Sequence, residues 1–438
     1  GRRAGALALA AHEGPAMSRL SVDLDRLYAS LTTLGEIGAY QDTRTGLSGV
    51  SRLALTAADG AGRRHVVEQM NSLGLSVSVD RIGNVFARRE GLRPELSPVM
   101  MGSHIDSVET AGRFDGCLGV LGGLEVIATL NDHGVRTARP VLVAFFTDEE
   151  GSRFGTDMLG SAVATGRLSL DEAYGLRDKR GLVLRDELES IGFLGDACER
   201  MAPPHAYLEC HIEQGPVLAS RAVELGVVTG VQAISWHELT IVGKSAHAGT
   251  TPMGLRADPA VAAARIALFM REMATSGRYG DGMRTTMGSI IPRPGLVNVV
   301  PAEVVCTVDL RNPDDAHMRR AETDLIGYYA EVEKLEGVNL SWRQTARTDT
   351  VTFAEGVQDR IEAAAKARGL STARIVSGAG HDAQELSRIA PAGMIFVPGE
   401  HDGISHNPRE LSTREHCGNG VNVLLDVLTS FANEETPA

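Results

Sequence analysis

The fold is decided by two stretches, Pro98-Val-Met-Met-Gly-Ser-His104-Ile-Asp106 and Pro140-Val-Leu-Val-Ala-Phe-Phe-Thr-Asp-Glu149-Glu150. In each, a short apolar run of the kind that forms β-strands ends in histidine or acidic residues. The apolar segment 117–130 between them is long enough for a helix, which predicts a β-α-β unit. Parallel β-α-β units place the carboxyl ends of their strands at one edge of the sheet, where ligands bind. We therefore expect His104, Glu149 and Glu150 to meet at this edge, with Asp115 from the loop after the first strand.

The paired glutamates indicate what binds there. Adjacent glutamates commonly belong to a solvated face, but Glu149 and Glu150 follow an apolar strand and precede Gly151. Charged side chains are rarely buried unless they are paired. The pattern therefore favours a cation-binding site.

Length and composition limit the class of protein. A chain of 438 residues is expected to form two domains. Its net charge of −13 argues against a nucleic-acid or anionic-membrane partner, because phosphate binding requires a basic surface. No apolar run approaches the ~20 residues that span a bilayer. The five scattered cysteines, without a CxxC pair, are typical of reduced thiols in a cytoplasmic protein.

Residues 1–16 contain two arginines and a short Ala/Leu run. This apolar run is short for a signal peptide. We interpret the segment as a leader that is not native and expect Met17 to be the natural start.

A change of pattern after Gly230 predicts a domain boundary. Alternating strands with two helices between them follow, which is typical of an α+β layer separate from the first sheet. We expect an inserted domain at 231–347, called the lid segment below. It would divide the catalytic domain into 17–230 and 348–438.

The candidate ligands suit a pair of metal ions. Hydrolysis of an unactivated amide needs a strong nucleophile and oxyanion stabilisation, and two metal ions ~3.5–4 Å apart supply both. The chain offers five nitrogen or oxygen ligands for such a pair: His104, Asp115, Glu150, His211 and His406. Asp106 would accept the other N–H of His104, and Glu149 is free to act as general base. On pattern alone, each histidine could equally be a hydrogen-bonded structural residue, and Asp115 a turn residue.

Six motifs resemble a known family. They are Gly102-Ser-His-Ile-Asp-Ser-Val, Gly112-x-x-Asp-Gly-x-x-Gly-Val, Phe146-x-x-Glu-Glu-Gly-x-Arg-Phe-Gly, His211-Ile-Glu-Gln-Gly-Pro-Val-Leu, Ala246-His-Ala-Gly-Thr-Thr-Pro-Met and Gly403-Ile-Ser-His-Asn-Pro-x-Glu. In this order, over about residues 20–428, they resemble the amidase/hydantoinase-carbamoylase family of dinuclear zinc hydrolases. Its members include N-carbamoyl-L-amino-acid amidohydrolases, β-ureidopropionases and allantoate amidohydrolases.

The resemblance implies an α/β fold with a discontinuous, zinc-exopeptidase-like catalytic domain and an inserted α+β domain for lid and dimerisation. It also implies two divalent metal ions per chain, one held by His104 and His211 and the other by Glu150 and His406. Asp115 would bridge them. The expected metal is zinc, although Mn, Co or Ni also suit such ligands.

The resemblance assigns further roles around the metals. Glu149 would move the proton, and His247 would reach across a dimer interface to stabilise the partner's oxyanion. Asn298 and Arg311 would bind the substrate carboxylate. Gln214 would contact the carbamoyl group. The loop carrying Gly378 and Gly380 would lie against the end of the substrate that carries the carboxylate.

Simpler roles are open for two of these residues. His247 could satisfy loop groups, and Arg311 could form a surface ion pair.

The expected reaction is hydrolysis of an N-carbamoyl-L-amino acid to the amino acid, CO2 and ammonia. The alternatives are allantoate or 3-ureidopropionate hydrolysis at the same site. More remote are an aminoacylase or dipeptidase, and a metal-binding relative without catalysis. The presence of Glu149 argues against the inactive relative, and Gln214 argues against the peptidase.

Overall fold

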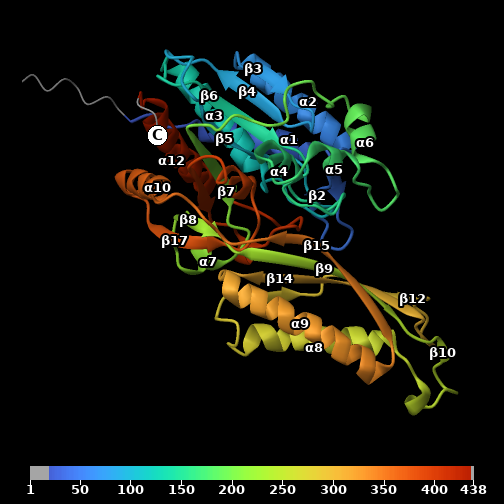
Figure 1. The fold of residues 1–438 in the computed structure, drawn as a ribbon. Helices are drawn as coiled ribbons and strands as arrows, with labels where there is room; N and C mark the ends of the chain where they lie inside the picture. Colours follow the sequence, from blue (N-terminus) through green and yellow to red (C-terminus); the bar gives the residue numbers. More distant parts are fainter. Residues whose placement is uncertain (1–18, 436–438) are drawn as a thin grey trace, which may run out of the picture.

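A computed structural model describes residues 19–435, and in this part of the chain two large β-sheets are accompanied by two small two-stranded ones (Figure 1). The predicted leader at residues 1–16 lies outside the described residues. Among the described helices, none combines the length and the apolar character needed to cross a membrane. All five cysteines are free thiols.

The larger sheet has nine strands, in the order β16-β8-β18-β7-β5-β6-β4-β3, with β17 paired to β8. Their bounds are β3 Ser76–Val79, β4 Val85–Arg89, β5 Val99–His104, β6 Val141–Phe146, β7 Ala206–Ile212, β8 Leu225–Val231, β16 Val351–Thr352, β17 Thr372–Ser377 and β18 Ala392–Val397. The central strands β6, β5, β7 and β18 run parallel. The predicted β-α-β unit is present as β5, the helix α3 (Cys117–Asp132) and β6.

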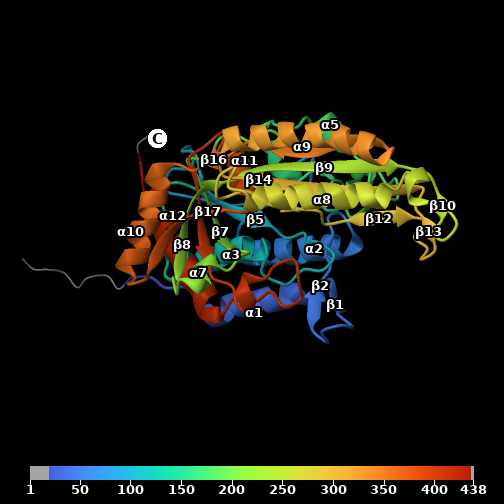
Figure 2. The same cartoon turned by 90° about the horizontal axis from the view of Figure 1, so that it is seen from below.

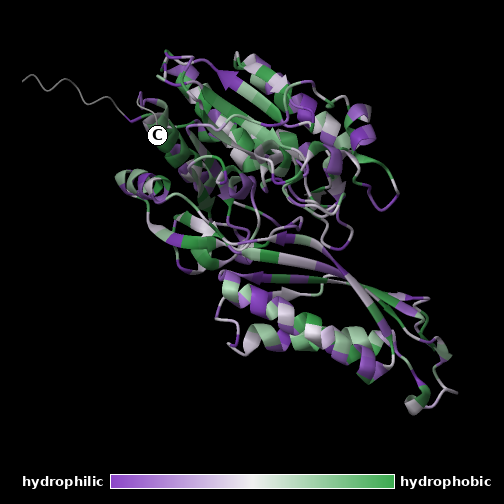
Figure 3. Ribbon diagram, in the orientation of Figure 1, coloured by the Kyte–Doolittle hydropathy of each residue, from purple (hydrophilic) through white to green (hydrophobic). Residues whose placement is uncertain are grey.

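Apolar cores lie on both faces of this sheet. On β5, Val99 and Met101 pack into the larger core, whereas the intervening Met100 packs into a second core on the opposite face. The helices α3, α10 (Glu355–Ala367) and α12 (Arg414–Ala432) cover the first face, and α4 (Leu159–Thr165) and α11 (Asp382–Leu386) cover the second. Two-sided burial explains why these strands read as continuous apolar runs, coloured green in Figure 3.

The smaller sheet lies in the lid segment. Its strands follow the order β11-β14-β9-β15, with β12 also paired to β14. Their bounds are β9 Ala233–Val242, β11 Arg284–Thr286, β12 Ile290–Arg293, β14 Glu303–Asn312 and β15 Asn339–Thr348. The helices α8 (Pro259–Thr275) and α9 (Asp315–Glu336) pack on one face around a core of their own, and Figure 2 shows both lying along the sheet. The domain boundaries at 231 and 347 stay predictions.

Further elements complete the described part of the chain. They are α1 Leu24–Glu36, β1 Ala39–Gln41, β2 Ser48–Val50, α2 Ala57–Ser72, α5 Leu170–Tyr174, α6 Leu184–Ser190, α7 Val217–Ser220, β10 Ala246–His247, the 3-10 turns Met253–Leu255 and His401–Gly403, and β13 Val299–Val300. β10 and β13 pair at the end of the lid segment farthest from the large sheet (Figures 1 and 2).

Candidate metal centre and active site

The register of the large sheet brings two histidines together. Val99 of β5 pairs with Ala206 of β7 in parallel. Five residues further along each strand stand His104 and His211, so both reach the same edge. Each donates from Nδ1 to a backbone carbonyl, His104 to Asp106 at 2.9 Å and His211 to Ile212 at 2.8 Å. These bonds direct the Nε2 lone pairs inward, which is the orientation a metal ligand needs.

The loop between β5 and α3 carries Asp115 into the space between these rings. The Glu410 carboxylate holds the loop by accepting the amides of Phe114 and Asp115 at 3.0 and 3.1 Å. Gly116 then has a φ of +69°, which favours glycine, and an added Cβ would lie 2.4 Å from the His104 ring. The turn that starts α3 therefore places Asp115 directly against His104.

The glutamates follow β6. Asp148 adopts a positive φ of 51° and turns the chain, so that both following side chains enter the site. The Asp106 carboxylate accepts the backbone amides of Glu149 and Glu150, each at 3.3 Å. The predicted contact between His104 and Asp106 is therefore made by the Asp106 carbonyl. The carboxylate lies 3.7 Å from the ring and fixes the glutamate turn instead.

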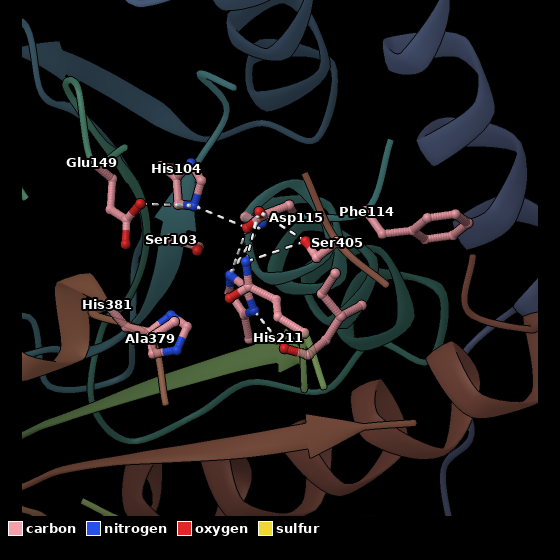
Figure 4. Close-up of polar contacts among 12 residues, drawn as sticks. Ser103, His104, Phe114, Asp115, Glu149, His211, Ala379, His381 and Ser405 are labelled. Atoms are coloured by element: carbon pink, nitrogen blue, oxygen red, sulfur yellow. Dashed lines mark hydrogen bonds and ion pairs between the residues drawn. The ribbon is translucent and has the colours of Figure 1, made fainter. Parts of the chain in front are cut away.

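Asp115 contacts two groups of side chains, and Figure 4 shows it beside His104 and His211 of the first group. Its Oδ1 lies 3.6 Å from His104 Nε2 and 3.2 Å from His211 Nε2. Its Oδ2 lies 3.1 Å from His406 Nε2, which is also 3.3 Å from Glu150 Oε2. Within each group, His104–Asp115–His211 and Asp115–Glu150–His406, the possible ligand atoms all lie within 4.8 Å of one another.

These side chains fit a pair of divalent metal ions. His104 Nε2 and Glu150 Oε1 are buried and lack a hydrogen-bond partner among the described residues. Orphaned polar atoms of this kind are costly unless something else binds them. Imidazole nitrogens and carboxylate oxygens, with one carboxylate shared between two groups, form a suitable donor set for zinc and for related ions.

The charges within the site favour cations. Burial alone would lower the pKa of His104, but Glu149 and Asp115 raise it well above its usual value. Burial opposes the cation at His406 too, yet Glu150 and Asp115 raise the pKa of His406 to about 11. The carboxylates around these histidines therefore stabilise positive charge in the site. When the imidazoles are uncharged, as metal ligands must be, this negative charge is left for a metal cation to neutralise.

The two central carboxyl groups respond in opposite directions. Burial would raise the pKa of Asp115, but the imidazoles of His104, His211 and His406 hold it well below its usual range. For Glu149 burial dominates and, despite His104, raises its pKa well above the usual range. Asp115 is therefore suited to permanent charge, and Glu149 to carrying a proton.

A cavity of about 330 Å³ opens beside the two groups. Its lining includes Glu149, Gln214, Arg311, Gly380 and His406. Gln214 Nε2 donates to Asp115 Oδ2 at 2.8 Å. The Arg311 guanidinium donates to the Gly378 carbonyl at 2.7 Å, which joins the lid segment to the loop after β17.

The remaining two predicted residues lie elsewhere. His247 is exposed on β10, and Asn298 is exposed beside it, with its carbonyl accepting the Ala248 amide at 3.0 Å. Figures 1 and 2 place β10 at the far end of the lid segment, away from β5 and β7. Within one chain, therefore, Asn298 is not brought together with Arg311.

Two residues of the site were not predicted. Asp309 forms a bidentate ion pair with Arg311, with a closest distance of 2.8 Å. Their spacing of two on one strand was the available signal, because such residues share a face. Glu410 closes the motif Gly403-Ile-Ser-His-Asn-Pro-x-Glu, but its amide contacts lie 295 and 296 residues away.

Comparison with known proteins places this site in a family. Residues 100–430 match peptidase family M20/M25/M40. The N-carbamoyl-L-amino-acid amidohydrolase of Rhizobium meliloti is 39% identical over 411 residues, covering 94% of this chain and 97% of that protein. The ureidoglycolate hydrolase of Arabidopsis thaliana is 32% identical over 425 residues, covering 95% of this chain and 88% of that protein.

A solved structure agrees with both relatives. The hydantoinase/carbamoylase family amidase from Burkholderia vietnamiensis matches with a TM-score of 0.90 and 41% identity, covering 95% of this chain and 99% of that one. The predicted α/β fold class and the resemblance carried by the six motifs are thereby confirmed. The chain belongs to peptidase family M20/M25/M40 and, within it, to the hydantoinase/carbamoylase amidases.

Proposed function

We propose that the protein is a metal-dependent amidohydrolase that cleaves N-carbamoyl-L-amino acids to the amino acid, CO2 and ammonia. The observation that carries this proposal is the shared Asp115 carboxylate between two ligand groups, in a cavity that also contains Arg311. The first feature suits amide hydrolysis, and the second suits a substrate with a carboxylate. The similarity to the carbamoyl-amino-acid amidohydrolase of Rhizobium meliloti supports the substrate class.

His104, His211, Glu150 and His406 would hold two zinc ions, with Asp115 between them. When bound, such ions supply Lewis acidity and lower the pKa of the attacking water. Glu149 would take the proton from this water and give it to the leaving nitrogen. Its raised pKa supports the second half of this task.

Substrate binding would use the walls of the cavity. Arg311 pairs with a carboxylate already, since Asp309 occupies the Nε/Nη2 edge of its guanidinium. The substrate carboxylate would take a place beside or instead of Asp309, and the Gly378 carbonyl would keep the guanidinium plane fixed. Gln214, whose amide donates to Asp115 Oδ2, would contact the carbamoyl group.

We infer a homodimer in which the lid segment contributes to the partner's site. His247 Nδ1 accepts the Gly249 amide at 3.0 Å, which leaves an Nε2–H donor on an exposed ring. Neighbouring apolar side chains are also exposed, including Met253, Leu296 and Val297. Exposed apolar side chains of this kind mark interaction sites, and Val297 directly precedes Asn298 in the chain. The free thiols support the expectation of a cytoplasmic protein.

A second candidate keeps the site and changes the substrate to ureidoglycolate, allantoate or 3-ureidopropionate. The similarity to the ureidoglycolate hydrolase of Arabidopsis thaliana favours it. All of these substrates combine a ureido group with a carboxylate. The same anchors would therefore serve them.

The test is ammonia release by zinc-, manganese- or cobalt-loaded protein. The substrates are several N-carbamoyl-L-amino acids, 3-ureidopropionate, allantoate, ureidoglycolate and an N-acetyl amino acid. The proposal expects the carbamoyl amino acids to have the highest kcat/KM. Preference for another ureido acid would favour the second candidate, and preference for the N-acetyl compound would overturn both.

A matched pair of variants tests the roles. Glu149→Gln should keep two metal ions per chain and lose about 10²–10⁴-fold in kcat, because proton transfer is lost. The control Glu95→Gln removes an exposed glutamate paired with Arg93 and should change neither. Full activity of Glu149→Gln would exclude Glu149 as the base.

A further inference from the structure

The lid segment contains a second arginine beside Arg311. In the ladder between β11 and β14, Arg284 stands directly opposite Arg311, and Thr286 stands opposite Asp309. Residues directly opposite each other in antiparallel strands share a face, with their Cβ atoms about 4.5–5.5 Å apart. The alternate residue Leu310 is buried in the lid core, so Arg284 and Arg311 share the face away from that core.

This face forms one wall of a cleft of about 730 Å³. Gln214, Asp309, Arg311, Ala379 and His406 line both this cleft and the cavity beside the metal ligands, so the two spaces are continuous. The cleft is lined further by Arg284, Arg221 and Arg374. A concentration of arginines is unexpected in a chain with a net charge of −13.

Most charges in the cleft are already paired. Arg374 forms ion pairs with Asp359 and Glu362, and Asp309 is bound by Arg311. The Glu213 carboxylate accepts two backbone amides, those of Val217 and Leu218. These groups leave the cleft without a free carboxylate close to β11.

Arg284 is different. Its guanidinium donates to the Gly282 carbonyl at 3.0 Å, and no acidic partner for it is found among residues 19–435. Asp309 already neutralises Arg311, which stands opposite Arg284 in the ladder. Among the described residues, the exposed Arg284 guanidinium is therefore left with a positive charge that no carboxylate pairs.

We propose that Arg284 is a specificity-determining residue that binds a second carboxylate, carried by the side chain of the carbamoyl amino acid. The proposal rests on the carbamoylase function above and narrows its substrate class to N-carbamoyl-L-aspartate and N-carbamoyl-L-glutamate. Arg311 binds the α-carboxylate, and Arg284, one strand further from β9, binds the side-chain carboxylate in the cleft. Two guanidinium groups on one face can each form a bidentate pair with a planar carboxylate.

The experiment compares substrates of nearly equal shape and different charge. For the metal-loaded wild type, kcat/KM for N-carbamoyl-L-glutamate should exceed that for N-carbamoyl-L-glutamine by about tenfold or more, since the neutral amide cannot form the bidentate ion pair with the Arg284 guanidinium. Arg284→Ala should bring this ratio close to one by lowering only the glutamate value. Arg284→Lys should retain part of the preference, because the charge remains and the fork is lost.

The control is Arg271→Ala, which removes an exposed arginine from α8 and should leave the ratio unchanged. Two results would overturn the proposal: equal use of both substrates by the wild type, or an equal loss for both substrates in Arg284→Ala. The second result would mean that Arg284 acts through Asp309 and Arg311 on every substrate.

A binding measurement separates this proposal from the proposed function. Titration calorimetry with L-glutamate and L-glutamine, the products, measures the subsite without any turnover. Tighter binding of glutamate that disappears in Arg284→Ala supports the subsite, even if every carbamoyl compound is left intact and the proposed reaction fails. Hydrolysis of carbamoyl amino acids with uncharged side chains, with no Arg284-dependent preference in either assay, would support the proposed reaction and exclude the second carboxylate subsite.

Discussion

Arg311 illustrates how one residue of the site depends on its neighbours. Its guanidinium donates to the Asp309 carboxylate from Nε and Nη2, which form one edge, and to the Gly378 carbonyl from Nη1. We expect Arg311→Ala to raise KM for carbamoyl substrates at least about tenfold, because a charged hydrogen bond to the substrate is lost. Metal content should remain at the wild-type value, since Arg311 touches none of the proposed ligands.

The matched variant is Arg311→Lys, which keeps the charge and loses the planar fork. An intermediate KM is expected. If Arg311→Ala leaves KM unchanged, the simpler role of a structural ion pair with Asp309 is correct.

A buried acid away from the metal ligands gives a pH prediction. Burial raises the pKa of Asp80 to about 7, although Ile82 and Asn84 donate backbone amides to its carboxylate. The unfolded chain ionises Asp80 near pH 4, so the native state binds more protons between about pH 4 and pH 7. In this window the contribution of Asp80 to the free energy of unfolding falls as the pH rises, and above pH 7 the loss is complete.

Asp80→Asn removes this titration. Relative to wild type, the variant should gain on the order of 2 kcal/mol in free energy of unfolding between about pH 5 and pH 8. The Oδ1 of the new asparagine can still accept the amides of Ile82 and Asn84. Any other loss of stability caused by the substitution would lower the free energy of unfolding equally at all pH values. Denaturant unfolding at both pH values measures the difference, and parallel pH profiles of the two proteins would contradict the prediction.

At the residue level, the sequence indicated the ligand set because each member ends a strand or stands in a glycine-containing motif. The structure brings His104, Asp115, Glu150, His211 and His406 together as expected from that pattern. The sequence did not indicate Glu410, whose carboxylate accepts backbone amides nearly 300 residues away. Such contacts depend on the whole fold and have no local signal.

At the level of elements, the start of α3 couples backbone geometry to the metal site. Gly116→Ala would introduce a Cβ at a φ of +69° and at 2.4 Å from the His104 ring. His104 must then move away from Asp115. We expect fewer bound metal ions per chain, measured by elemental analysis, and a proportional loss of activity.

The control is Gly134→Ala near the other end of α3. Gly134 has a φ of +62°, but an added Cβ would meet nothing within 4 Å. This variant should lose only about 1–2 kcal/mol of stability through backbone strain and keep its metal. Equal metal loss in both variants would show that strain, and not contact with His104, is responsible.

The elements differ in how visible they are in the sequence. β6 is uniformly apolar and β5 begins with three apolar residues, so both strands were visible in the sequence. β11 and β12 pair with the same strand β14 but are separate, and between them the Thr307 hydroxyl accepts the Ser289 amide. β8 lies inside the sheet but contains Gly230, where a Cβ would meet the Val351 carbonyl at 2.0 Å. The close approach of the two backbones requires glycine at this position. The glycine interrupts the apolar pattern by which the strand could have been predicted.

For the whole molecule, one chain provides the metal ligands and displays His247 and Asn298 on a distant tip. The sequence indicated an inserted segment, but it did not indicate how far apart Arg311 and His247 lie within that segment. The long strands of the smaller sheet separate Arg311, on β14, from His247, on β10 (Figure 1). The proposed homodimer would complete each site with a second copy. It requires a two-fold arrangement in which each tip reaches the other chain's cavity.

Subunit complementation tests this arrangement. His247→Ala and Glu149→Gln should each be inactive as pure proteins. In a mixed dimer, one site combines the intact Glu149 of the first chain with the intact His247 of the second, while the other site lacks both. Equal mixing after dissociation should therefore restore about a quarter of the wild-type activity, because half of the dimers are mixed and each has one complete site. If His247 instead acted within its own chain, no mixture would contain a complete site, and activity would stay at the level of the separate variants.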